Sequence, residues 1–156
     1  MREQLYALKE FKNRWYVVAR DAGDGLVKSF ALDRLSDLEI TGKSFLYPKE
    51  FDVEEEYRHF FGIIIPLGQQ PEEVVLSFDP VQGKYIKSLP LHQSQKVLND
   101  NDKELRVRLY LCITYDFIQE LLSHGESMRV IEPESLANSM KKTYQRALDR
   151  YAEPNE

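Results

Sequence analysis

The stretch Asn13 to Arg20, with the sequence NRWYVVAR, decides how the first part of the chain folds. Its aromatic and β-branched residues favour a strand, in which side chains point alternately to the two faces. One face, which we expect to pack in a core, carries Trp15, Val17 and Ala19. The other face carries Arg14, Tyr16, Val18 and Arg20. The stretch therefore predicts a strand with one apolar face and one basic, aromatic face.

Outward from this stretch, residues 5–20 and 26–41 form two β-rich runs, separated by the turn signal DAGDGL at 21–26. In the second run Lys28, Phe30, Leu32 and Arg34 are at every second position and would lie on one face of a strand. This pattern predicts a curled antiparallel hairpin of the kind found in small barrels. The acidic run Glu54–Glu56 and the aromatics after it predict a short helix with one apolar face.

The second half of the chain predicts alternating strands and helices. Residues 73–78 form a β-branched strand, and Asp79 and Pro80 are a good N-cap and first residue for a helix with Val81, Tyr85 and Leu89 on one face. Residues 93–113 predict a hairpin that turns at 99–102. In its second strand Arg106 and Arg108 alternate with apolar residues, so that one face is polar.

The end of the chain predicts a helix, a strand and a last helix. Asp116 and Gln119 resemble a capping box at a helix start, and Gly125 is a plausible stop. A strand follows at 128–133. The last helix, from Pro133 and Ser135, has an apolar stripe of Leu136, Met140, Tyr144, Leu148 and Tyr151. The order β-α-β-β-α-β is the ferredoxin-like arrangement.

We therefore expect an α+β protein with a boundary at the Pro-, Gly- and Gln-containing segment PLGQQPEE. The predicted parts are a β-barrel portion at 1–65, a linker at 66–73 and a ferredoxin-like domain at 74–156. The last helix of this domain has two interpretations: its stripe packs on the sheet, or part of it forms a dimer seam.

Composition limits the classes of function. The 156 residues carry a net charge of −5, which argues against a protein that coats DNA through charge alone. Residues 1–50 have a net charge of +1 and the remainder −6. The single cysteine, Cys112, lies in an apolar run and predicts a buried side chain in a reducing cytoplasm. The sequence shows neither a secretory signal nor a membrane-spanning run, so we expect no membrane association.

Catalytic and metal-binding signals are weak. His59, His92 and His124 are far apart and have no second ligand at metal-binding spacing. There is no nucleophile elbow, P-loop or dinucleotide-binding motif. We expect no enzyme activity, no metal and no cofactor. An enzyme on a ferredoxin-like scaffold stays an alternative, and a pocket that joins carboxylates to His92 would support it.

Binding of an anion is the better-supported function. Arg14, Tyr16, Arg20 and Arg34 could form a basic, aromatic patch, since arginine pairs with phosphate and aromatic rings stack on bases. The alternative is that Trp15 and Phe30 belong to the core while the arginines are solvated.

The segments LYALKEFKNRWYVVARD and VKSFALDRLSDLEI together resemble the WYL domain of bacterial transcriptional regulators. The Trp-Tyr-Leu triplet of that family stands here as Trp15, Tyr16 and Val17. The run from Phe30 to Leu35 is similar to its F-x-L-D-R-I segment. The later segments FGIIIP, PLHQSQ and MRVIEPESL resemble the C-terminal extension that follows WYL domains.

The resemblance implies a fold and a function. It implies an SH3-like, Sm-type barrel that senses a ligand, often a single-stranded nucleic acid or a nucleotide, followed by a ferredoxin-like extension in a homodimer. The ligand-binding positions that it implies are Tyr6, Lys9, Arg14, Tyr16, Arg20, Phe30 and Arg34. The alternative is a structural dimerisation module that binds no small ligand.

The chain departs from the family pattern in two ways. The third triplet position is Val17, a mild change within a strand. The family pattern also has further strands upstream of LYALKEF and a DNA-binding winged helix-turn-helix, through which alone operator DNA would be bound. We expect a fragment that lacks both, whose open barrel edge is paired with another copy or distorted.

Overall fold

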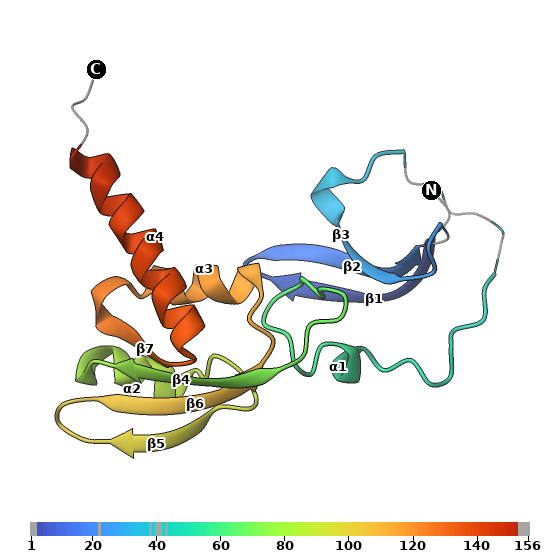
Figure 1. Cartoon of the computed structure of the whole chain (residues 1–156). Coiled ribbons are helices and arrows are strands. Elements are labelled where there is room, and N and C mark those ends of the chain that lie inside the picture. The colour runs from blue at the N-terminus through green and yellow to red at the C-terminus, as the bar shows by residue number, and fades with distance from the viewer. Residues whose placement is uncertain (1–2, 22, 38, 40–41, 43, 153–156) are drawn as a thin grey trace. The chain divides into compact units, whose positions relative to one another are not determined.

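The computed structural model describes residues 3–21, 23–37, 39, 42 and 44–152. The chain forms two compact units, Met1–Gly68 and Gln69–Glu156. The described strands form one antiparallel sheet in each unit, with three strands in the first and four in the second (Figure 1). The predicted α+β class is confirmed. No described helix is long and apolar enough to cross a membrane.

The sheet of the first unit has the order β1 (Glu3–Phe11), β2 (Arg14–Asp21), β3 (Val27–Ala31). The prediction of one β run over residues 5–20 was wrong, because β1 and β2 are separate strands that turn at Lys12 and Asn13. These two residues have φ angles of 50° and 63°, as a two-residue hairpin turn requires. The three strands form an open series, and the SH3-like barrel stays a prediction.

The turn between β2 and β3 lies in the predicted DAGDGL segment and is stabilised by two ion pairs. Lys28 Nζ lies 2.5 Å from Asp21 Oδ2 and 2.6 Å from Asp24 Oδ2. Hydrogen bonds to these carboxylates raise the pKa of Lys28 to about 12. Gly25 has a φ of +73°, which glycine adopts without strain.

The prediction that Trp15 belongs to the core was wrong, since its side chain is 50% exposed. The pairing of β2 with β3 ends at Tyr16, so Trp15 has a strand neighbour only on the β1 side, at Glu10. Val18, which we expected on the solvated face, is fully buried. Both faces of the central strand therefore carry buried side chains.

After β3 the chain forms η1 (Leu32–Arg34) and later α1 (Val53–Glu56). The carboxylate of Asp52 caps α1 by accepting a hydrogen bond from the amide of Glu54 at 2.8 Å. The predicted short helix is confirmed, but its predicted apolar face is not, because the aromatics follow its end and none of its residues is buried. Tyr57, directly after α1, is buried.

The second unit has the strands β4 (Glu72–Phe78), β5 (Lys96–Asp100), β6 (Leu105–Leu111) and β7 (Met128–Glu132). They pair in the order β5-β6-β4-β7, and every pair is antiparallel. With a helix between β4 and β5 and another between β6 and β7, this is the topology that the β-α-β-β-α-β order predicts.

Helix α2 (Pro80–Ser88) follows β4, with Asp79 at its N-cap as predicted. Asp79 Oδ1 accepts hydrogen bonds from the amides of Val81 and Gln82. Val81, Tyr85 and Leu89, which the spacing places on one face, are all exposed. The buried residues of α2 are Gly83 and Ile86, since the absence of a side chain at Gly83 lets the helix approach β6.

Helix α3 (Tyr115–Ser123) begins two residues earlier than the capping box at Asp116 and Gln119 predicts. Its N-cap is Thr114, whose hydroxyl accepts a hydrogen bond from the amide of Phe117 at 3.3 Å, and not Asp116. A short helix, η2 (Gly125–Ser127), then leads into β7. Phe117 and Leu121 of α3 are fully buried, and Cys112, just before it, is buried as predicted.

The last helix, α4 (Glu134–Ala152), packs along β7. Leu136 and Met140 from its predicted apolar stripe are buried. The same stripe continues through Tyr144, Leu148 and Tyr151, which are exposed, and Figure 1 shows this half of α4 extending past the sheet. Packing on the sheet thus explains only the first half of the stripe.

Candidate functional site

Lys9 is the most enclosed cation of the first unit's sheet. It pairs with Tyr16 across β1 and β2, and its Nζ lies 4.5 Å from the centre of the Tyr57 ring. Burial lowers the pKa of Lys9. No ion pair between Lys9 and a carboxylate is present in the part of the chain that the structure describes. Its ammonium group therefore keeps hydrogen-bond donors for an anion.

Tyr57 is fixed in place by Ser29 of β3. The two hydroxyl oxygens lie 2.6 Å apart, and Ser29 Oγ also donates to the carbonyl of Ile63 at 3.2 Å. A serine hydroxyl has one proton, so the tyrosine hydroxyl is the donor between them. Burial raises the pKa of Tyr57, which keeps the phenol protonated for this bond. These bonds hold the ring next to Lys9.

Arg14 and Arg34 lie at one end of this sheet. Arg14 starts β2, and its Nη1 is 3.7 Å from Asp33 Oδ2, the residue before Arg34 in η1. Arg14 and Asp33 are both more than half exposed, so this ion pair is weak and is readily exchanged for another anion. Alternation along β2 puts Arg14 on the same face as Tyr16 and Lys9, which we call the Lys9 face.

Two of the predicted site residues lie away from this cluster. Arg20 is on the Lys9 face but six residues from Arg14, about 20 Å along the strand, and its Nε donates to the carbonyl of Gly25 at 2.9 Å. Phe30 pairs with Val17 and therefore lies on the opposite face. The structure thus places Lys9, Arg14 and Tyr16 on one face of the sheet, and Arg34 lies at the end of the sheet where Arg14 begins β2.

Tyr6 lies in an aromatic cluster that the sequence analysis does not foresee. The β1–β2 pairing shifts register between Leu5 and Ala7, so that Tyr6 is the extra residue of a bulge. Its ring centre lies 4.5 Å from that of Phe51, 5.5 Å from that of Tyr47 and 6.4 Å from that of Phe45. Tyr47 and Phe45 are partly exposed, and such rings can stack on bases.

The residues that the sequence analysis missed are Phe45, Tyr47, Phe51 and Tyr57. Their only sequence signal is a high density of aromatics between residues 45 and 61. Among the described residues, no group of three or more His, Cys, Asp or Glu side chains could hold a metal ion. The chemistry of the Lys9 face is therefore that of cationic donors beside aromatic rings.

Comparison with known proteins assigns both units. Residues 4–40 match the WYL domain and residues 70–148 match the WCX domain. Among solved structures, the chain is similar to proteasome accessory factor B/C (PafBC) of Arthrobacter aurescens, with 22% identity and a TM-score of 0.42. That similarity covers 97% of this chain and 23% of the other. Among curated proteins, none matches the sequence.

Proposed function

The chain belongs to the family of proteins in which a WYL domain is followed by a WCX domain, and from this membership we propose that it is the effector-sensing region of a transcriptional regulator. The effector is an anion, either a single-stranded nucleic acid or a nucleotide. It binds to the Lys9 face of the first unit. The region acts by binding and not by catalysis.

The observation that carries this proposal is the position of Lys9. A half-buried ammonium group over the Tyr57 ring, without a carboxylate partner among the described residues, is a costly arrangement that an anionic ligand would relieve. Arg14 and Arg34 extend the positive charge towards the open end of the sheet. Arginine forks bind phosphate in two-pronged geometry, which suits a polynucleotide backbone.

The aromatic rings supply the second half of the recognition. Tyr16 is next to Lys9 across the strand pair, and the cluster of Tyr6, Phe45, Tyr47 and Phe51 has exposed ring surface. Base stacking on such rings contributes about 1–3 kcal/mol per base. We expect little sequence preference, because stacking does not distinguish the bases by their hydrogen-bonding edges.

The experiment that tests this function is a titration of the chain with labelled single-stranded DNA, RNA and nucleotides at several salt concentrations. Arg14→Ala and Arg34→Ala are expected to weaken binding, each by about tenfold for one lost charged hydrogen bond. Each should also reduce the slope of log affinity against log salt by about 0.7. The matched control is Arg150→Ala, an exposed arginine in the last turn of α4.

Binding of no polyanion or nucleotide by the folded chain would contradict the proposal. Equal loss of affinity in the Arg150→Ala control would show that only net charge matters. If Arg14→Ala and Arg34→Ala leave affinity unchanged while binding persists, the effector lies elsewhere on the chain.

A second function, dimerisation, is favoured by α4. Tyr144, Leu148 and Tyr151 continue the stripe of the buried Leu136 and Met140 into solvent, beside a groove of about 530 Å³ between α4 and β7. A second copy of α4 in antiparallel orientation would cover these residues about a twofold axis. Light scattering over a range of concentrations tests for this dimer, and a monomer at high concentration would contradict it.

A further inference from the structure

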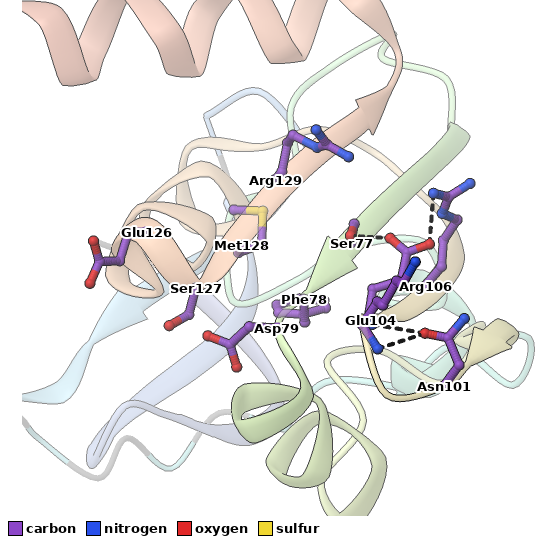
Figure 2. A pocket seen from close by; sticks show the side chains of 11 residues that line it. Ser77, Phe78, Asp79, Asn101, Glu104, Arg106, Glu126, Ser127, Met128 and Arg129 are labelled. Atoms are coloured by element: carbon purple, nitrogen blue, oxygen red, sulfur yellow. Dashed lines mark hydrogen bonds and ion pairs between the residues drawn. The ribbon is translucent and has the colours of Figure 1, made fainter.

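A pocket at one end of the second unit's sheet is separate from the residues assigned above. It has a volume of about 430 Å³ and lies where β4, the β5–β6 turn and the start of β7 meet (Figure 2). The range of small-molecule sites is about 300–1,000 Å³. Phe78 and Met128 also border the pocket, and both are buried.

Strand register places two arginines beside one serine in this pocket. Ser77 of β4 pairs with Arg106 of β6 on one side and with Arg129 of β7 on the other. Residues paired in this way lie on the same face of a sheet, in neighbouring strands about 4.8 Å apart. Figure 2 shows the two arginines on either side of Ser77. Lys103, in the β5–β6 turn, also lines the pocket.

The carboxylates that line the pocket are mostly occupied by the protein itself. Glu104 accepts hydrogen bonds from Ser77 Oγ at 2.5 Å and from Arg106 Nη2 at 2.7 Å, and the Ser77 bond is the largest cause that lowers its pKa. Asp79 is the N-cap of α2. Glu126 is exposed and points away from the two arginines in Figure 2.

The basic side chains that line the pocket, in contrast, retain N–H groups that can donate hydrogen bonds to a ligand. Arg129 is exposed, and in the described part of the chain neither Arg129 nor Lys103 has a side-chain hydrogen bond or ion pair. Arg106 uses one terminal nitrogen for Glu104, while its buried Nε has no hydrogen-bond partner. A buried donor without a partner is uncommon in native proteins and marks a place where a ligand or water completes the network.

We propose that this pocket binds a small phosphate-bearing molecule, with the phosphate over Ser77 between Arg106 and Arg129. A phosphate dianion can accept hydrogen bonds from several cationic side chains at once. A carboxylate ligand is a poorer fit, because Arg106 already binds the carboxylate of Glu104. The rest of the pocket, next to the phosphate, takes the organic part of the ligand. The second unit is then a sensor in its own right, and this assignment does not rest on the Lys9 face.

Calorimetric titration of the whole chain tests the proposal, with inorganic phosphate, a nucleoside monophosphate and the corresponding nucleoside as probes. The monophosphate is expected to bind more tightly than phosphate alone, and the nucleoside not at all. Phosphate that binds as tightly as the monophosphate would show that the ligand is the free ion. Arg129→Gln should weaken binding by at least tenfold. Arg108→Gln is the matched control, because Arg108 lies on the same face but pairs with Glu73 at 3.4 Å outside the pocket.

Glu104→Gln tests the role of Arg106 without removing it. Loss of the competing negative charge should tighten phosphate binding several-fold, and weaker binding would overturn the placement. Absence of saturable binding of either phosphate probe, or full affinity in Arg129→Gln, would overturn the proposal. Loss of binding in Arg14→Ala together with full affinity in Arg129→Gln would move the phosphate to the Lys9 face.

Discussion

Gly83 of α2 lies so close to Leu105 of β6 that a Cβ atom on Gly83 would come within 2.7 Å of the Leu105 Cβ atom. Real Cβ atoms do not approach so closely, and both atoms are fixed to backbone, so α2 or β6 would have to move. This contact explains why α2 buries the side that carries Gly83 and Ile86. The glycine is required by packing and not by its backbone conformation.

We therefore predict that Gly83→Ala destabilises the second unit. Overpacking costs about 1–3 kcal/mol, whereas alanine in place of a helical glycine gains about 1 kcal/mol. We expect a net loss of up to about 2 kcal/mol, measured by denaturant unfolding. Lys84→Ala, at the exposed neighbouring position, should change stability by less than about 0.5 kcal/mol. A more stable Gly83→Ala variant would contradict the close packing.

This contact also shows which parts of the fold the sequence predicts. Sequence patterns of a few residues correctly predicted that α2 begins at Asp79 and Pro80. The order of such patterns also predicted the strand order of the second unit. The packed side of α2 depends on Leu105, which is 22 residues away from Gly83, whereas the apolar residues Val81, Tyr85 and Leu89 are exposed. Periodicity describes the helix alone, while burial depends on what approaches it.

The candidate site likewise has features that the sequence predicts and features that it does not. Alternation along β2 correctly separates Arg14 and Tyr16 from Trp15, because it depends only on the strand. It does not show that Trp15 is half exposed, or that Tyr57 packs against Lys9 from 48 positions further along the chain. Such contacts are made by tertiary packing, for which the local sequence carries no signal.

The hydroxyl pair of Tyr57 and Ser29 gives a second prediction. Tyr57→Phe removes one hydrogen bond but keeps the ring over Lys9, so we expect a loss of about 1 kcal/mol in stability with little change in effector affinity. A double-mutant cycle with Ser29→Ala should give a coupling free energy of about 0.5–1.5 kcal/mol. Additive effects of the two changes, measured by denaturant unfolding, would contradict the 2.6 Å contact.

A third prediction concerns the dependence of stability on pH. His124, at the end of α3, lies against the Phe78 ring and within 3.3 Å of Gln82 Nε2. Burial lowers the pKa of His124, and Glu120, at 3.9 Å, only partly opposes this effect because that distance is too long for a hydrogen bond. The unfolded chain therefore takes up this proton at a higher pH than the folded chain does.

It follows that the contribution of His124 to stability is fully present above about pH 6.5, the unfolded pKa. This contribution is lost as the pH falls below that value. The denaturant midpoint should therefore decrease between about pH 7 and pH 5. His124→Gln should flatten this part of the profile, and the loss at lower pH from carboxylates such as Glu104, whose pKa is also lowered, should persist. An unchanged slope between pH 7 and pH 5 in His124→Gln would assign the effect to other groups.

The last prediction separates the two halves of the α4 stripe. Met140 is 5% exposed and Leu148 is 63% exposed, although both belong to the same stripe. Met140→Ala should cost about 2–5 kcal/mol of stability, as for other buried large-to-small changes.

Leu148→Glu should leave the melting temperature of the monomer nearly unchanged, because the site is open to solvent. In a dimer, however, it would bury a charge at the seam and weaken association by at least a hundredfold. Light scattering distinguishes these effects, with Lys142→Gln as the control that makes the same change in net charge away from the stripe. If Leu148→Glu and Lys142→Gln dimerise equally well, the exposed half of the stripe is not the seam.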